Sequence, residues 1–159
     1  MPVVDINHHL THITQQDENY CWACGLAMLK GRRTWEQALE LADRVPQSAR
    51  NPNDGSLLNP ETAARALHLH PRRVTSLAPN DIVTELRRGP IAIFGQYKLT
   101  RIFRHVMVLS LIRGNTDTPG TTIIGVDDPW ANGSRWIGTW ANFHGSKQTL
   151  VAPEWVVSR

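Results

Sequence analysis

The chain has 159 residues and a formal net charge of +3, and 41% of its residues are hydrophobic and 19% charged. This length suits one domain with its own core, and basic residues that occur only as scattered short pairs argue against a nucleic-acid-binding protein. No apolar run is long enough to cross a bilayer and no secretory signal is present, so we expect a soluble protein with no nucleic-acid or membrane partner.

Residues 1–13 have no clear hydrophobic periodicity, and we expect them to form an extended lead-in. Three histidines in this segment, His8, His9 and His12, suggest a zinc site with the cysteines that follow, because imidazoles and thiolates are common zinc ligands. Their spacing matches none of the common zinc motifs, and a surface cluster is the simpler interpretation. We therefore predict neither a metal nor another cofactor.

The first predicted helix carries a cysteine at its start. Asn19 is a good N-cap, and the apolar residues after it recur at helical spacing, which predicts a helix from Tyr20 to Gly31. Cys21 then lies in the first turn, where unpaired backbone N–H groups and the positive end of the helix dipole favour a thiolate. A cysteine that needs activation as a nucleophile is expected at such a position.

Two glutamines lie in the segment that approaches this helix. Gln15, six residues before Cys21, can fold back over the helix start and offer its side-chain amide to a developing oxyanion. Its neighbour Gln16 is the second candidate for this task, and the spacing to the cysteine favours Gln15.

Cys21 and Cys24 also have the spacing of a dithiol redox motif. That motif normally follows a strand, whereas the segment before Cys21 is polar and has no strand signal. Two cysteines so placed on one helix do not suit a disulfide bridge, and a free thiol suits a reducing compartment. The simpler interpretation of Cys24 is a small buried residue on the inner face of the helix.

Three further helices are predicted before Gly89 from capping boxes, N-terminal prolines and apolar faces, at about residues 34–45, 59–69 and 81–88. Residues 47–58 are mostly turn formers and predict a loop. A loop of this length either lines a substrate cleft or merely connects two helices, and the residues do not decide between these roles.

After Gly89 the pattern changes to that of strands, predicted at residues 90–97, 104–113, 121–126, 134–138 and 148–152. Helices followed by strands are typical of an α+β domain in which one antiparallel sheet packs on the helices. We therefore predict a single domain over residues 1–159, with a helical half at about 14–89 and a sheet half at about 90–159.

A thiolate nucleophile needs a base, and the base needs an orienting group. The second predicted strand has His105 near its start, and the third leads into the adjacent Asp127 and Asp128. Antiparallel pairing of these two strands brings a carboxylate near the imidazole. Because adjacent strand residues face opposite sides of a sheet, only one of the two aspartates can reach His105.

The chain resembles papain-like cysteine peptidases, in particular the small bacterial branch that includes bacteriocin-processing peptidase domains and papain-fold effectors or toxins. The resemblance extends over most of the chain and rests on the order of four motifs, which are Gln15, Cys21-Trp22, His105-Val106 and Asp128-Pro129-Trp130. It implies a papain-like fold, with the thiolate contributed by the helical half and the imidazole by the sheet half.

The resemblance also implies a role for each of these residues. Cys21 is expected to be the nucleophile and His105 the general base and acid. Asp128, rather than Asp127, is expected to orient the imidazole, and Gln15 to stabilise the oxyanion. The family often has asparagine at the position of Asp128, so this position varies.

The function implied is cleavage of a protein substrate through a Cys-His-Asp triad. We expect no inhibitory propeptide before the site, and an unrestrained peptidase endangers the cell that makes it. We therefore expect an effector or toxin domain, cytoplasmic or delivered into another cell, restrained by a cognate immunity protein that covers the cleft. An acyltransferase, a glutamine deamidase using the same triad, or a non-catalytic binding module of the same fold are the alternatives.

Overall fold

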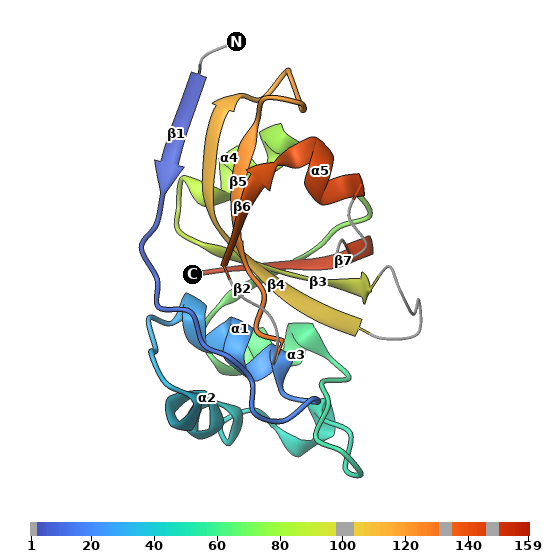
Figure 1. Ribbon diagram of the computed structural model, residues 1–159. Helices are drawn as coiled ribbons and strands as arrows, with labels where there is room; N and C mark the ends of the chain where they lie inside the picture. Colours follow the sequence, from blue (N-terminus) through green and yellow to red (C-terminus); the bar gives the residue numbers. More distant parts are fainter. Residues whose placement is uncertain (1–2, 98–103, 131–134, 146–149) are drawn as a thin grey trace.

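The computed structural model describes residues 3–97, 104–130, 135–145 and 150–159, in which helices cover both faces of a curved sheet (Figure 1). Five α-helices and one 3-10 turn lie in these residues, and they are α1 (Cys21–Leu29), α2 (Trp35–Ala42), η1 (Gln47–Ala49), α3 (Pro60–Ala66), α4 (Pro79–Leu86) and α5 (Trp140–Gly145). No helix in the described part of the chain is both long and apolar enough to span a membrane.

The strands of the described residues form one sheet of seven, and every pair is antiparallel. They are β1 (Val3–Asn7), β2 (His70–Arg73), β3 (Ile91–Tyr97), β4 (Arg104–Asn115), β5 (Ile123–Asp127), β6 (Arg135–Thr139) and β7 (Leu150–Ser158). The order across the sheet is β2-β7-β3-β4-β5-β6, and β1 pairs with the part of β4 that lies beyond β3. The α+β class predicted from the sequence is confirmed.

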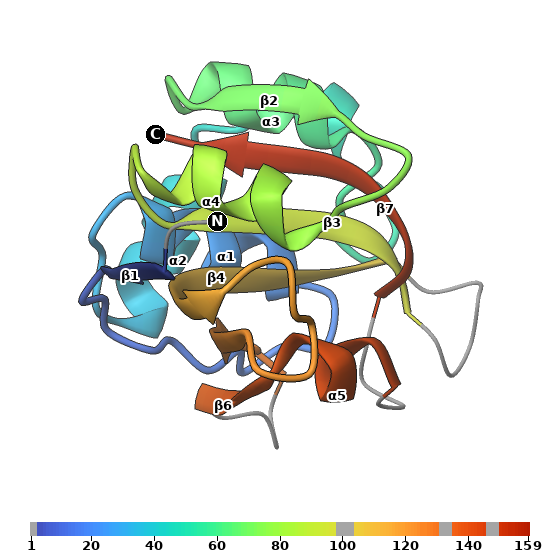
Figure 2. The same cartoon turned by 90° about the horizontal axis from the view of Figure 1, so that it is seen from above.

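The two central strands are buried on both faces, because the sheet has a hydrophobic core on each side. One core joins the sheet to α1, α2 and α3, and its central-strand residues are Ala92, Phe94, Val106 and Val108. The other joins it to α4 and α5, and its central-strand residues are Ile91, Ile93, Met107 and Leu109. Figure 2 looks past α4 onto the sheet, with α1 and α2 beyond it. The strand period of two therefore divides these continuous apolar runs between two cores.

Helix α1 is buried along its whole length, from Cys21 to Leu29. It packs closely on β4, because a Cβ atom at Gly25 would lie 2.9 Å from Val106 Cγ2. The predicted stop is confirmed at Gly31, which has a φ of +71° and donates to the Met28 carbonyl at 3.1 Å. These contacts fix where the N-terminus of α1 meets the sheet.

The predicted N-cap of α1 is wrong by one residue. Tyr20 is the N-cap, and its carbonyl accepts hydrogen bonds from the Ala23 and Cys24 amides at 3.1 and 3.3 Å. The Asn19 amide donates instead to Asp17 Oδ1 at 2.9 Å, in a turn that precedes the helix. Cys21 nevertheless occupies the first helical position, as the sequence predicts.

Several other observed boundaries of helices and strands differ from the predicted ones. Helices α2 and α3 end about three residues earlier than predicted, and α4 begins at Pro79 because Asp81 accepts a hydrogen bond from the Ala78 amide at 3.0 Å. Strands β1 and β2 were not predicted, since one lies in the supposed lead-in and the other has the sequence His70-Pro71-Arg72-Arg73. Each is held by pairing with a longer strand rather than by its own pattern.

Replacing Gly25 by valine is expected to destabilise the protein by about 1–3 kcal/mol, because the added carbons overpack the contact with Val106. Urea unfolding measures this change. Gly120→Val is the matched control, since nothing lies within 4 Å of a Cβ at Gly120, and it is expected to change stability by less than about 0.5 kcal/mol. Equal stability of the two variants would contradict the packing described here.

Candidate active site

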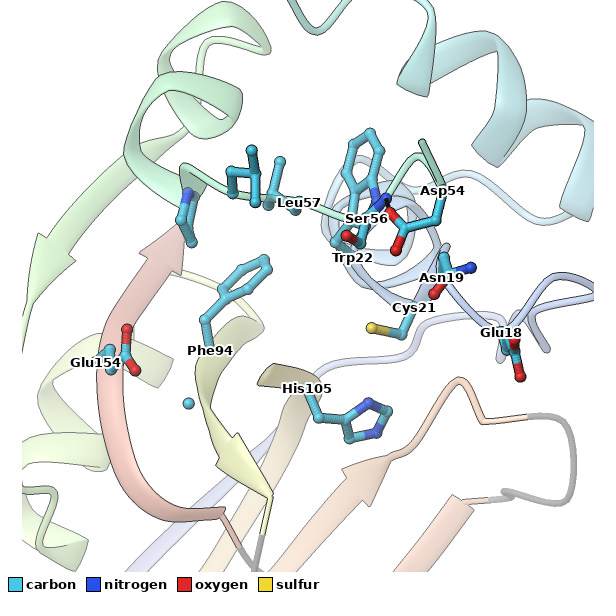
Figure 3. Close-up of a pocket in the computed structure, with 13 residues that line it drawn as sticks. Glu18, Asn19, Cys21, Trp22, Asp54, Ser56, Leu57, Phe94, His105 and Glu154 are labelled. Atoms are coloured by element: carbon cyan, nitrogen blue, oxygen red, sulfur yellow. Dashed lines mark hydrogen bonds between the residues drawn. The ribbon is translucent and has the colours of Figure 1, made fainter. Parts of the chain in front are cut away.

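Cys21 lies where the helical layer meets the sheet. Its side chain is 6% exposed, and its sulfur points into a cavity that also contains the ring of His105 (Figure 3). As the first residue of α1, Cys21 has a backbone N–H with no acceptor inside the helix. A charge that develops beside this residue therefore meets the positive end of the helix dipole.

His105 and Asp128 are in direct contact across neighbouring strands. His105 Nε2 lies 2.7 Å from Asp128 Oδ1, and both residues are largely buried. The pairing of β4 with β5 causes this contact, because the register places Val108 opposite Asp127. Cys21 faces the same ring across the cavity, and its interaction with His105 is among the causes that raise the pKa of this imidazole. The three residues named from the sequence are thus brought together.

The partners of His105 decide its protonation. Burial by itself lowers the pKa of this imidazole, but the hydrogen bonds to Asp128 and Cys21 and the charges of both partners raise the pKa to about 10. The ring is therefore an imidazolium at neutral pH. Cys24 behaves differently, since burial and the charge of Cys21 raise the pKa of its thiol to about 12. Cys24 is fully buried on α1 and remains a neutral thiol.

Trp130 contacts both members of the imidazole–carboxylate pair. Its backbone N–H donates to Asp128 Oδ1 at 3.0 Å, so this oxygen accepts two hydrogen bonds. Its ring lies edge-on to His105, with the ring centroids 6.2 Å apart and the planes at 82°. This position suits a role of Trp130 in shielding the pair from water.

A cavity of about 260 Å³ opens beside Cys21, between α1 and the central strands. The sheet contributes Phe94 and His105 to its lining, and α1 contributes Cys21 and Trp22. Trp22 is buried and donates its indole N–H to the Gly55 carbonyl at 3.2 Å, which ties the following loop to the helix.

The loop at residues 47–58 forms one wall of this cavity, to which it contributes Asp54 and Leu57. Arg50 anchors it, because one guanidinium nitrogen donates to the Tyr20 hydroxyl at 3.0 Å and the group lies over the Tyr20 ring. The sequence left open whether this loop lines a cleft or merely connects two helices, and the structure shows that it lines the cavity.

Gln15 lies against the segment that follows β5. Its backbone N–H donates to the Pro129 carbonyl at 2.7 Å, and its side-chain Nε2 donates to the Asp17 carbonyl at 3.0 Å. The side chain is buried but is not among the described residues that line the cavity. Gln16, the second candidate, is exposed.

Asp127 does not reach His105. It is completely buried, and its Oδ1 accepts a hydrogen bond from His12 Nδ1 at 2.9 Å. The surface-cluster interpretation is thus wrong for His12, and also for His8, whose Nε2 lies 2.5 Å from the Leu86 carbonyl. Sequence reasoning missed the role of His12, because nothing in its neighbours indicates a partner 115 residues away.

The described residues contain no group of three histidine, cysteine, aspartate or glutamate side chains arranged to hold a metal ion. Both cysteines are free thiols. Cys21, His105 and Asp128 therefore place a thiol, an imidazole and a carboxylate next to one another in space. This is the arrangement of a cysteine nucleophile with its base and the group that orients the base.

Comparison with known protein families gives one match to most of the chain. A family model described as papain-like cysteine protease AvrRpt2 matches residues 4–148, a span that contains Gln15, Cys21, His105 and Asp128. A comparison with curated protein sequences gave no significant match.

Replacing Asp128 by asparagine is expected to lower the pKa of His105 from about 10, because the imidazolium loses a negatively charged acceptor. The neutral ring then appears at lower pH, and NMR titration of isotope-labelled histidine measures this shift. Asp117→Asn, in the exposed turn after β4, is the matched control and should leave the titration of His105 unchanged. A titration of His105 that is the same in all three proteins would contradict the described pair.

Proposed function

The chain belongs to this family of papain-like cysteine proteases, and we propose that it cleaves its protein substrate through a triad of Cys21, His105 and Asp128. The observation that carries the proposal is the imidazole of His105, which lies 2.7 Å from the Asp128 carboxylate and lines one cavity together with Cys21 at the start of α1. The family assignment favours peptide hydrolysis over the transferase, deamidase and binding-module alternatives.

Acylation begins from a thiolate–imidazolium pair. The Cys21 sulfur attacks the carbonyl carbon of the scissile bond, forming a C–S bond while the carbonyl electrons move to oxygen. The imidazolium of His105 then gives its proton to the amide nitrogen as the C–N bond breaks, so the amine leaves and a thioester remains. Asp128 keeps the ring oriented throughout, as the hydrogen bond to Nε2 allows.

The two partners of His105 explain how one residue serves as acid and then as base. In the resting enzyme the charge and hydrogen bond of Cys21 help to hold the pKa of His105 at about 10. When the sulfur becomes part of a thioester that contribution disappears, so the imidazolium loses its proton more readily. The neutral ring then takes a proton from water, whose oxygen attacks the thioester and releases the acid product and the Cys21 thiolate.

The oxyanion that forms during both steps needs hydrogen-bond donors. The backbone N–H of Cys21 is one donor, because its helical position leaves it without an intrahelical acceptor. The proposed second donor is the Gln15 side chain, whose Nε2 carries two hydrogens and gives one of them to the Asp17 carbonyl. The hydrogen bond from the backbone N–H of Gln15 to the Pro129 carbonyl supports this role, because it keeps Gln15 beside the residues that directly follow Asp128.

A finer part of the proposal concerns the biological setting. We infer from the resemblance to papain-fold effectors and toxins that the protease acts in a target cell and is restrained by a cognate immunity protein. The open cavity beside Cys21 is the surface that such a partner would cover. Co-purification with the product of a neighbouring reading frame would support this setting, whereas harmless expression of the active protease alone would count against it.

Cys21→Ala and His105→Ala are each expected to abolish cleavage, because one removes the nucleophile and the other its base. The measurement is mass-spectrometric identification of new protein N-termini in cells that express each form. Cys24→Ala is the control, since that buried thiol has no part in the reaction and its loss should leave the same termini. A glutamine deamidated or an acyl adduct formed without chain cleavage would instead identify a deamidase or a transferase.

Gln15→Ala is expected to lower kcat about 10²-fold or more, with a much smaller effect on KM, because an oxyanion donor acts mainly in the transition state. Steady-state kinetics on a peptide that spans the identified cleavage site measures the loss. Gln16→Ala, at the exposed neighbouring position, should leave kcat unchanged. If the loss followed Gln16 instead, the assignment of the donor would be wrong.

A further inference from the structure

A second imidazole–carboxylate pair lies next to the one used for catalysis. His12 Nδ1 donates to Asp127 Oδ1 at 2.9 Å, and Asp127 directly precedes the carboxylate that holds His105. Because adjacent residues of a strand face opposite sides, the two aspartates hold different histidines. His12 is not among the described residues that line the cavity.

The carboxylate of Asp127 depends on His12. Asp127 is 0% exposed, and a buried carboxylate is costly unless it is paired and hydrogen-bonded. Its Oδ2 has no hydrogen-bond partner among the described residues, and Arg135 Nε lies 3.9 Å away, beyond hydrogen-bond distance. Arg135 donates instead to the Ser110 hydroxyl at 3.0 Å. Among the described residues, His12 thus gives this carboxylate its side-chain hydrogen bond, beside a longer ion pair with Arg135, and loss of that hydrogen bond would be unfavourable.

The pair joins two segments that the proposed mechanism needs in a fixed relation. His12 lies in residues 8–20, which link β1 to α1 without forming a helix or strand and which carry Gln15. Asp127 ends β5 and leads directly to Asp128. Three residues after His12, the Gln15 amide bonds to the Pro129 carbonyl at 2.7 Å. The linking segment is therefore hydrogen-bonded at two points, to Asp127 at the end of β5 and to Pro129 two residues later.

We propose that His12 is a positioning residue of the protease. Its bond to Asp127 holds the segment carrying Gln15 against the strand end carrying Asp128, so that the oxyanion donor and the imidazole orienter keep one relative position. This inference rests on the proposed function of Gln15. Precision matters here, because a displacement of about 1 Å at an active site can lower a rate about 10²-fold.

Two small probes of Cys21 separate this role from a general loss of structure. Attack on the carbonyl of p-nitrophenyl acetate forms a C–S bond, develops an oxyanion and releases p-nitrophenolate, so it needs the oxyanion donors. Alkylation by iodoacetamide displaces iodide at a saturated carbon and develops no oxyanion. Both reactions use the same sulfur and base, and Cys21→Ala identifies the signal that comes from Cys21. If Cys21→Ala left both signals intact, the proposed function itself would fail, whatever His12 does.

His12→Ala is expected to slow acylation by the ester about tenfold to 10²-fold while the rate of alkylation stays unchanged. His12→Asn should retain most of the acylation rate, because its side-chain amide can donate to Asp127 from a similar position. His9→Ala, at an exposed position in the same segment, is the matched control and should change neither rate. In a Gln15→Ala background, His12→Ala should cause no further loss, since both changes affect one interaction.

A variant that leaves a buried charge unpaired can fail to fold, so a double variant supports the test. His12→Leu with Asp127→Asn removes the buried carboxylate together with its hydrogen-bond donor and should fold, as thermal unfolding would measure, yet it should lose acylation rate as His12→Ala does. The proposal is overturned if acylation is unchanged, if acylation and alkylation fall together, or if the His12 and Gln15 losses multiply. Each of those results would make the pair a structural contact only.

Discussion

The hydrogen bond between His105 and Asp128 is the contact on which the proposed chemistry depends. It exists because β4 and β5 are adjacent and antiparallel, so that residues 23 apart in the chain lie 2.7 Å apart in space. A change of one residue in the register would turn Asp128 toward the other face of the sheet. The two hydrophobic cores that fix this register therefore also determine the protonation of the imidazole.

The position of the sulfur depends on a different contact. Helix α1 brings Cys21 to the sheet, and the close approach of Gly25 to Val106 sets the depth of the helix on β4. Val106 directly follows His105, so the contact that sets the position of the helix is next to the residue proposed to receive the thiol proton. The helical layer and the sheet thus meet at the residues that must react together.

The sequence predicts the parts of this site that rest on long, periodic segments. Cys21 at a helix start and a strand pairing that brings a carboxylate to His105 were both predicted from the residue pattern, whereas the choice of Asp128 over Asp127 came from the family resemblance. Strand β2 and the partner of His12 were not predictable, since both depend on contacts with residues far along the chain. The Asn19 cap was wrong because Asn19 lies in a turn closed by Asp17, and the first helical hydrogen bonds are accepted by the Tyr20 carbonyl instead.

Asp127 and Asp128 are adjacent in the chain but hold different histidines, one proposed to take part in catalysis and the other proposed to position the site. Asp128 has a side chain that is 14% exposed and holds the ring of His105, which lines the cavity, whereas Asp127 is fully buried and holds the ring of His12, which is not among the described residues that line it. A buried carboxylate that is hydrogen-bonded to a histidine resists separation from it, because separation leaves the carboxylate without that donor. That property suits a contact whose proposed task is to keep an irregular segment in place, beside the pair of His105 and Asp128 that is proposed to take part in catalysis.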